Sequence, residues 1–245
     1  MTDTAPTEDD APVEIHKPKA AHSLREFLIE IGTIICGILI ALGLEQTVEA
    51  IHRHNEVREA RKALNAEIAF DLGSSEVYIS QIGCIDKRLD EIERWIASFE
   101  TPNPMRIERE LQYPTWMIFR RSAWSTASMG AVEKMPVELR MTYGAMYDSL
   151  NFQDRFLFMM RDNWVDLRKR LNSKTLSERD RQDLLGDVQQ IREINTYFAD
   201  NHRALVLKWA RELGVKPDAS ETLASVRARA EAVCRPLLPS TTVGR

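Results

Sequence analysis

The sequence predicts an all-α protein in which one N-terminal transmembrane helix continues into a long helix and an antiparallel helical-bundle domain. Three observations lead to this prediction. Residues 27–44 form an apolar run interrupted by a single charge, Glu30. The following chain carries apolar residues at intervals of three and four, the spacing of one helical face. Ten glycines and ten prolines in 245 residues leave long segments uninterrupted, and none alternates as a strand would.

The chain divides into four expected regions. Residues 1–22 are rich in Thr, Asp, Ala and Pro and have too few apolar side chains to fold, so we expect a disordered tail. Residues 23–50 are the predicted transmembrane helix and residues 51–234 the helical extramembrane domain. Residues 235–245 are expected to be a second disordered tail.

The predicted span is just long enough to cross a bilayer. A hydrocarbon core of roughly 30 Å needs about 20 apolar residues at about 1.5 Å each. Residues 31–44 have no charged side chain, and the helix-forming residues 45–49 follow in place of a small-residue cleavage site. The lipid bilayer is therefore the first expected partner. The alternative is a buried core helix of a soluble protein.

One face of the span carries the residues expected to pack against another helix. Thr33, Gly37 and Ala41 recur every four residues, and Glu30 falls near the same face. Small residues at this spacing let two membrane helices approach closely, and a carboxyl group inside a bilayer requires a partner or reaches the headgroups. These four residues predict a homo-oligomer formed through the span. The alternative is that the glycine is incidental and Glu30 simply reaches the headgroups.

The first predicted helix after the span extends to about residue 99. Its apolar rows comprise Leu64, Ile68 and Leu72, followed by Ile82, Ile85, Leu89, Ile92 and Ile96. Residues 73–75, Gly-Ser-Ser, predict a kink or short break. The prolines in residues 101–104 end the helix.

The second half of the domain predicts a helical hairpin. Pro136 suits a first helical position, and an apolar face extends from Leu139 to Leu171. A polar break at residues 172–175 precedes Ser177 and Asp180, which resemble a capping pair. The next helix ends at Gly214, and a last short helix is expected over about residues 221–234.

Charge and cysteine content bear on compartment and partners. The net charge is −4, and residues 45–245 are neutral overall, which offers no electrostatic footprint for nucleic acid. Basic residues on the two sides of the span nearly balance, so the length of the following domain favours export of that domain, with the N-terminus inside. The alternative is a cytoplasmic domain. Cys84 and Cys234 are equally compatible with a disulfide and with two free thiols.

Residues 31–42, Ile-Gly-Thr-Ile-Ile-Cys-Gly-Ile-Leu-Ile-Ala-Leu, lead directly into a charged helix. This arrangement resembles uncharacterised bacterial single-span membrane proteins with an Ile/Gly-rich N-terminal anchor, a long helix and a helical extramembrane domain. The resemblance covers about a fifth of the chain. It implies an architecture and no activity. Together with the orientation argued above, we expect a bacterial inner (cytoplasmic) membrane protein with the bulk of the chain in the periplasm.

No pattern of residues indicates catalysis. His52 and His54 point in different directions on a helix, and the tight ligand spacing of a zinc site is missing. The nucleophile elbow G-x-S-x-G, the P-loop and G-x-G-x-x-G are all missing from the sequence. We therefore expect no enzyme activity, no metal and no cofactor.

The best candidate for a partner-binding surface is an aromatic and arginine-rich cluster, Tyr113, Trp116, Arg120, Arg121 and Trp124. Such residues dominate binding hot spots. The alternative is that the aromatic rings plug the end of the bundle while the arginines reach solvent. The sequence thus predicts a membrane-tethered interaction or scaffold module, or an accessory subunit of an envelope assembly, that binds an unknown membrane protein. The alternative function is a single-span sensor or regulator with a ligand-binding helical bundle.

Overall fold

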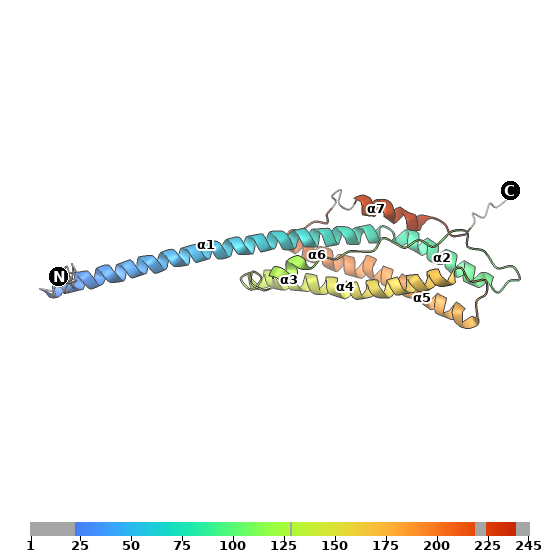
Figure 1. Cartoon of the computed structure of the whole chain (residues 1–245), viewed down its shortest axis with the longest axis horizontal. Helices are drawn as coiled ribbons and strands as arrows, with labels where there is room; N and C mark the ends of the chain where they lie inside the picture. Colours follow the sequence, from blue (N-terminus) through green and yellow to red (C-terminus); the bar gives the residue numbers. More distant parts are fainter. Residues whose placement is uncertain (1–22, 128, 219–223, 239–245) are drawn as a thin grey trace, which may run out of the picture. The chain divides into compact units, whose positions relative to one another are not determined.

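The computed structural model describes residues 23–127, 129–218 and 224–238. Every regular element within these residues is helical, which confirms the all-α prediction (Figure 1). The chain divides into two units, Met1–His52 and Arg53–Arg245. The longest helix, α1 (Leu24–Ile79), belongs to both. The predicted tail over residues 1–22 lies outside the described residues.

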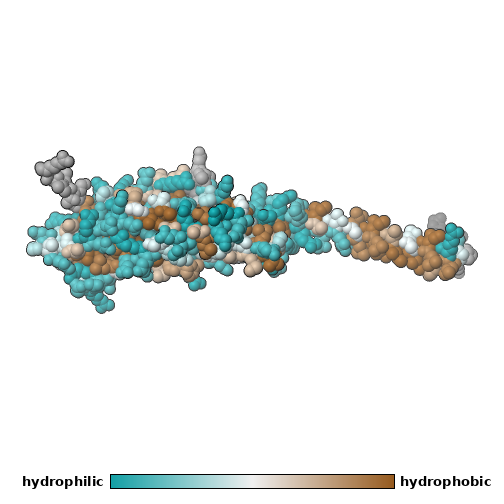
Figure 2. Space-filling model, turned by 180° about the vertical axis from the view of Figure 1, so that it is seen from behind, coloured by the Kyte–Doolittle hydropathy of each residue, from teal (hydrophilic) through white to brown (hydrophobic). Residues whose placement is uncertain are grey.

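The first unit contains the apolar part of α1. This part is long and apolar enough to cross a membrane, with a mean hydropathy of 2.4 and none of it buried. Its side chains appear as a mostly brown, hydrophobic surface (Figure 2). A buried core helix, the alternative left open by the sequence, does not fit these exposed side chains.

The second unit is built from three rows of helices. The first row is the end of α1 followed by α2 (Ile82–Ser98), the second is α4 (Val137–Arg170), and the third is α5 (Glu178–Thr196), the π-helix η1 (Tyr197–His202) and α6 (Arg203–Leu213). Three shorter helices complete it, namely α3 (Ser122–Ala127), α7 (Ala224–Ala230) and the 3-10 helix η3 (Glu231–Cys234).

Hydrogen bonds between rows define their directions. The hydroxyl groups of Tyr143 and Tyr147 in α4 donate to Asn65 and Glu67 of α1, at 2.5 and 2.8 Å, so the two helices run parallel. In contrast, α4 and α5 form the predicted antiparallel hairpin, in which Asn163 donates to Gln190 at 2.6 Å.

Local signals in the sequence account for two helix ends. Ser177 and Asp180 form a reciprocal capping box at the start of α5, with both bonds to backbone N–H groups at 3.1 Å. Gly214 ends α6 with φ of 72°, a left-handed conformation that glycine adopts without a steric penalty. The start of α4 differs slightly from prediction, because Pro136 is its N-cap rather than its first helical residue.

The predicted break at residues 73–75 is wrong, because α1 continues through them to Ile79. The helix is interrupted at Ser80 and Gln81 instead, where the Ser80 hydroxyl donates to the Val77 carbonyl at 2.7 Å. Gln81 also binds both backbone groups of Thr115, at 2.8 and 3.0 Å. These tertiary bonds fix the position of the break, whereas glycine and serine at 73–75 are tolerated within the helix.

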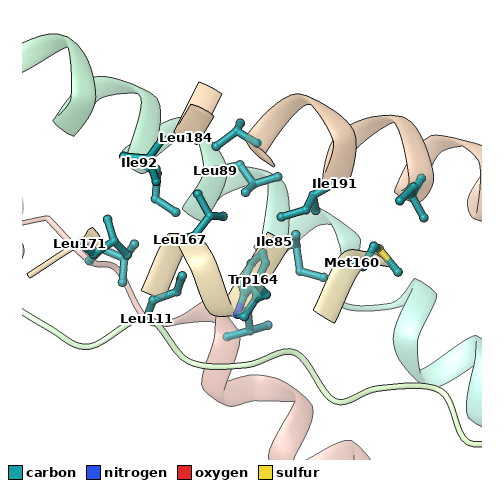
Figure 3. Packing of buried hydrophobic residues seen from close by; sticks show 14 of the residues in the cluster. Ile85, Leu89, Ile92, Leu111, Met160, Trp164, Leu167, Leu171, Leu184 and Ile191 are labelled. Carbon is teal, nitrogen blue, oxygen red and sulfur yellow. The ribbon is translucent and has the colours of Figure 1, made fainter. Parts of the chain in front are cut away.

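The larger hydrophobic core lies where α2, α4 and α5 meet (Figure 3). Each helix contributes residues spaced by three or four, among them Ile85, Leu89 and Ile92 from α2, Trp164 and Leu167 from α4, and Leu184 and Ile191 from α5. A second cluster joins α1, α4 and α6 around Leu64, Ile68, Tyr143, Met146 and Val206. The periodic apolar faces predicted from the sequence are therefore the faces that become buried.

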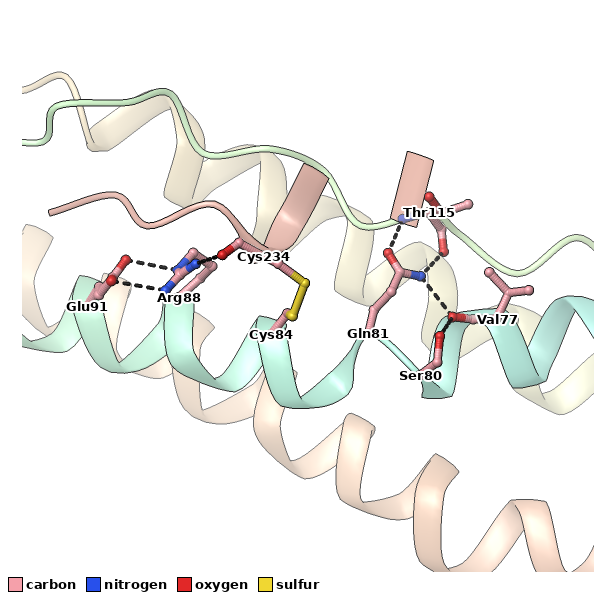
Figure 4. The surroundings of a disulfide bond; sticks show 8 residues. All are labelled: Val77, Ser80, Gln81, Cys84, Arg88, Glu91, Thr115 and Cys234. Carbon is pink, nitrogen blue, oxygen red and sulfur yellow. Dashed lines mark hydrogen bonds and ion pairs between the residues drawn. A yellow bond between two sulfur atoms is a disulfide. The ribbon is translucent and has the colours of Figure 1, made fainter. Parts of the chain in front are cut away.

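The end of the described chain is held against α2. Leu237 and Leu238 are buried, so the expected disordered tail does not begin at residue 235, and residues 239–245 lie outside the described residues. Cys84 and Cys234 form a disulfide, with their Cα atoms 4.7 Å apart (Figure 4). This pairing resolves the alternative that the sequence left open. Of the cysteines, only Cys36 is a free thiol.

Candidate functional site

The five residues of the aromatic and arginine-rich cluster do not form one surface. They lie on or just after a non-helical segment, residues 108–121, which we call the strap. Tyr113 and Trp116 pack partly buried against the larger core, whereas Trp124 stacks on Tyr147 with 4.7 Å between ring centroids. The rings therefore pack within the domain.

The two arginines of that cluster have separate partners. The Arg120 guanidinium lies 3.4 Å from the centre of the Phe70 ring. Arg121 forms an ion pair with Asp154 of α4 at 2.7 Å. A role for the cluster in binding a partner stays a prediction.

The four candidate span-packing residues all lie in the exposed part of α1. The Thr33 hydroxyl donates to the Ile29 carbonyl at 2.9 Å, as threonine commonly does within a helix. A Cβ atom built on Gly37 would meet nothing within 4 Å. Glu30 and Ala41 are likewise exposed, so this face is open in the single chain. Whether a second helix covers it stays a prediction.

The most specific polar constellation in the domain is a row of side chains on α1 that holds the strap. Asp71 and Ser74 accept hydrogen bonds from the backbone N–H groups of Arg120 and Ile118, at 2.9 and 2.8 Å. Gln81 binds Thr115 further along, as described above. A non-helical segment buried against a helix needs such partners, because an unpaired backbone group away from water is costly. The side chains of this row supply hydrogen-bond partners for the backbone of the strap.

Glu67 begins this row and caps α3. Its carboxyl group accepts from the N–H groups of Ala123 and Trp124, at 2.9 and 3.3 Å, and from the hydroxyls of Ser122 and Tyr147, at 3.1 and 2.8 Å. Burial raises the pKa of Tyr147, and the hydrogen bond to Glu67 raises it further, so Tyr147 remains a donor. Glu67 therefore positions the first turn of α3 with four donors.

Asp71, one turn further along α1, has a different environment. Its side chain is fully buried at 0% exposure. Oδ1 accepts the Arg120 N–H, whereas Oδ2 has no hydrogen-bond partner within the described chain. The pKa of Asp71 is raised to about 8, mainly by burial and also by the nearby charge of Glu67, whereas the Arg120 N–H and the charges of Arg120 and Arg121 partly oppose the increase. Asp71 is thus an acid that holds its proton near neutral pH.

A second buried titratable residue lies in the π-helix. His202 is 3% exposed, and its Nε2 lies 2.8 Å from the Ser149 hydroxyl of α4. Burial lowers the pKa of His202, so the neutral imidazole is favoured. This pair resembles a nucleophile and its base, but it lies within the packing of α4 against η1. Neither residue lines the grooves described next.

Among the grooves formed by the described residues of the second unit, two are candidates for binding. One, of about 610 Å³, lies between α1 and α3 and is lined mainly by small residues, including Ala60, Ala63, Ala123 and Ala127. The other, of about 740 Å³, lies between the end of α2, the chain that follows it and the α4–α5 turn, and is more polar. Among the described residues, no group of three or more metal-ligating side chains occurs.

Sequence inspection missed Glu67 and Asp71. Both lie one residue away from the apolar row of Leu64, Ile68 and Leu72, so they share the buried side of α1 with it. Acidic residues four apart beside a core row are a usable signal, but the same spacing is common on solvated helices. Only contacts with the strap distinguish the two cases.

Comparison with known proteins adds no assignment, because no family model, no curated protein and no solved structure matches this chain.

Proposed function

We propose that the chain is a membrane-tethered helical interaction module, either a scaffold or an accessory subunit of an envelope assembly. The observation that carries the proposal is the exposed apolar part of α1, which continues as one helix into the core of the second unit. Apolar side chains exposed over this length have a natural solvent in lipid. In this proposal α1 serves both as the membrane anchor and as a core helix of the domain.

The disulfide supports an extracytoplasmic domain. Disulfides persist in oxidising compartments such as the bacterial periplasm and are rare in the cytosol. The Cys84–Cys234 bond therefore favours a single-pass protein of the bacterial inner membrane with its N-terminus inside and its helical domain in the periplasm. A cytoplasmic domain is the alternative. The resemblance to single-span bacterial membrane proteins is compatible with either orientation.

Partners follow from the surfaces described above. We propose a homo-oligomer formed through Glu30, Thr33, Gly37 and Ala41, together with an unidentified membrane protein as a second partner. We include no catalytic step and no nucleic-acid partner.

A combined experiment tests the anchor and the orientation. Carbonate extraction of membranes should leave the full-length protein in the pellet, and recovery in the supernatant would contradict the anchor. A reporter fused to the C-terminus should show activity that requires export. In a Cys36→Ser background, a maleimide-polyethylene glycol reagent should shift the denatured protein only after reduction. A shift without reduction, with an export-negative reporter, would place the domain in the cytoplasm.

One observation favours the alternative function, a single-span regulator. Asp71, a buried acid poised to titrate near neutral pH, lies in the same helix as the predicted span. A change in its charge would act on the strap and on α1 together. In this alternative, the signal is a change in the protonation of Asp71, and α1 carries it to the membrane.

A further inference from the structure

Arg120 and Arg121 are near enough to lower the pKa of Asp71, but within the described residues neither guanidinium forms an ion pair with its carboxyl group. Its carboxyl group is packed between α1 and the strap, with Oδ2 unpartnered within the described residues. The nearby positive charges have other partners, because Arg120 lies over Phe70 and Arg121 pairs with Asp154. A buried carboxylate without a cation or a full set of donors is strongly disfavoured.

The remaining groups that face Asp71 do not compensate it. Glu67, on the same helix, adds a charge of the same sign. Tyr147 of α4 donates its hydroxyl to Glu67 and not to Asp71. The strap contributes the Arg120 N–H group, one donor for two carboxyl oxygens. The Arg120 N–H and the two nearby arginine charges therefore only partly offset the burial of the Asp71 carboxylate.

The strap depends on few bonds in this region. Four side chains hydrogen-bond to its backbone along residues 112–121. Trp164 binds Gln112 and Gln81 binds Thr115. Further along, Ser74 binds Ile118 and Asp71 binds Arg120. Between Ile118 and the Glu67 cap, Asp71 holds the strap backbone at Arg120, while the side chain of Phe119 packs against the cores and that of Arg121 pairs with Asp154. Displacing residues 117–121 would bring water to Asp71, at the cost of exposing Met117 and breaking the Arg121–Asp154 ion pair, but it would leave the hydrogen bonds between the three helical rows described above in place.

We propose that Asp71 is a proton-controlled clasp: its neutral carboxylic acid keeps residues 117–121 of the strap on α1, and loss of the proton releases them. In the closed state Asp71 is neutral and buried. In the open state water solvates its carboxylate, and Arg120 can leave Phe70 to approach it. The clasp does not depend on membrane tethering, and its test is separate from that of the proposed function.

The direction of the pH effect follows from linkage. The pKa of Asp71 is about 8 in the closed state, and it returns toward the ordinary aspartate value of 3.8 when water reaches the group. The closed state therefore binds the proton more tightly. Its stability is complete below about pH 4 and is lost progressively as the pH rises toward about 8. Above that value both states are ionised and the effect levels off.

Hydrogen exchange of the full-length protein in detergent or nanodiscs tests the clasp. Protection factors for residues 117–121, corrected for the intrinsic exchange rate, should fall by up to about tenfold per pH unit between pH 5.5 and 7.5. Residues 184–195 of α5 are the internal reference and should not follow this slope. Equal slopes in the two segments, or a flat profile in the strap, would overturn the proposal.

Matched variants separate the clasp from other titrations, such as that of His202. Asp71→Asn keeps the shape and one acceptor but cannot ionise, so its strap should stay protected at every pH. Ser74→Ala weakens the strap without removing the acid, so its protection should be lower but should keep the wild-type slope. If Asp71→Asn does not fold, a flat Ser74→Ala profile would still overturn the proposal. A wild-type slope in folded Asp71→Asn would do the same.

Discussion

At the scale of single residues, Glu67 and Asp71 show how neighbouring carboxyl groups on one helix acquire different roles. They lie one turn apart on α1, and both are buried. Glu67 receives four donors, whereas Asp71 receives one. Burial is the main reason that Asp71 retains its proton, and its single donor offsets that burial only in part.

Glu67→Gln should lower the free energy of unfolding by about 2–4 kcal/mol, because the new amide places donor hydrogens against groups that are themselves donors. Glu76→Gln is the matched control. Glu76 pairs with Arg203 at the surface, at 2.7 and 3.0 Å, and exposed pairs contribute about 0–1 kcal/mol. Urea denaturation of both variants in detergent provides the measurement. Equal losses would contradict the capping role of Glu67.

At the scale of elements, residues 234–238 at the C-terminal end of the described chain are held against α2, and we call this segment the latch. Arg88 donates to the Cys234 carbonyl and forms a buried ion pair with Glu91 at 2.9 Å (Figure 4). Glu91 in turn accepts the Leu237 N–H at 2.7 Å, and the Leu237 carbonyl accepts the Glu108 N–H at 2.9 Å. The ion pair thus joins the latch to α2, and the disulfide closes the same contact covalently.

Cys234→Ser should lower the free energy of unfolding by about 2–5 kcal/mol, because the disulfide closes a long loop, with a sequence separation of 150, and so restricts the unfolded chain. Adding a reductant to the wild type should reproduce the loss. Cys36→Ser removes the free thiol and should leave stability unchanged. Thermal unfolding followed by circular dichroism measures all three. An unaltered midpoint after full reduction would show that the noncovalent contacts of the latch suffice.

At the scale of the whole molecule, two units share α1, and any association through the apolar part brings the helical domains of two copies together. The row Thr33, Gly37 and Ala41 is exposed in the single chain and lined by small side chains. In lipid such a row associates through close packing of backbones rather than through hydrophobicity. If two copies associate at this row, as proposed, their association should be sensitive to side-chain size.

Gly37→Ile should weaken self-association in a membrane-insertion reporter by several-fold, because a branched side chain separates the two backbones. Ile38→Leu, about 100° around the helix, should retain the wild-type signal. A carbonate wash checks that each variant is still inserted. Equal signals from all three proteins would mean that the span is an anchor without a packing face.

The sequence by itself determined the features that depend on neighbouring residues. The all-α class followed from apolar spacing by three and four. The start of α5 followed from Ser177 and Asp180, and the end of α6 followed from Gly214. The membrane-length apolar run was equally visible. These features are local, because helix period, caps and the length of an apolar run involve residues within a few turns of each other.

Only the tertiary structure decided how the strap is held and which cysteines meet. The helix break moved from Gly73 to Gln81 because Gln81 binds Thr115, and the aromatic rings of the candidate binding cluster pack against the cores because the strap lies there. The buried state of Asp71 depends on the same contacts. Each of these outcomes is set by residues far apart in the chain, whose desolvation and hydrogen bonding no local pattern encodes.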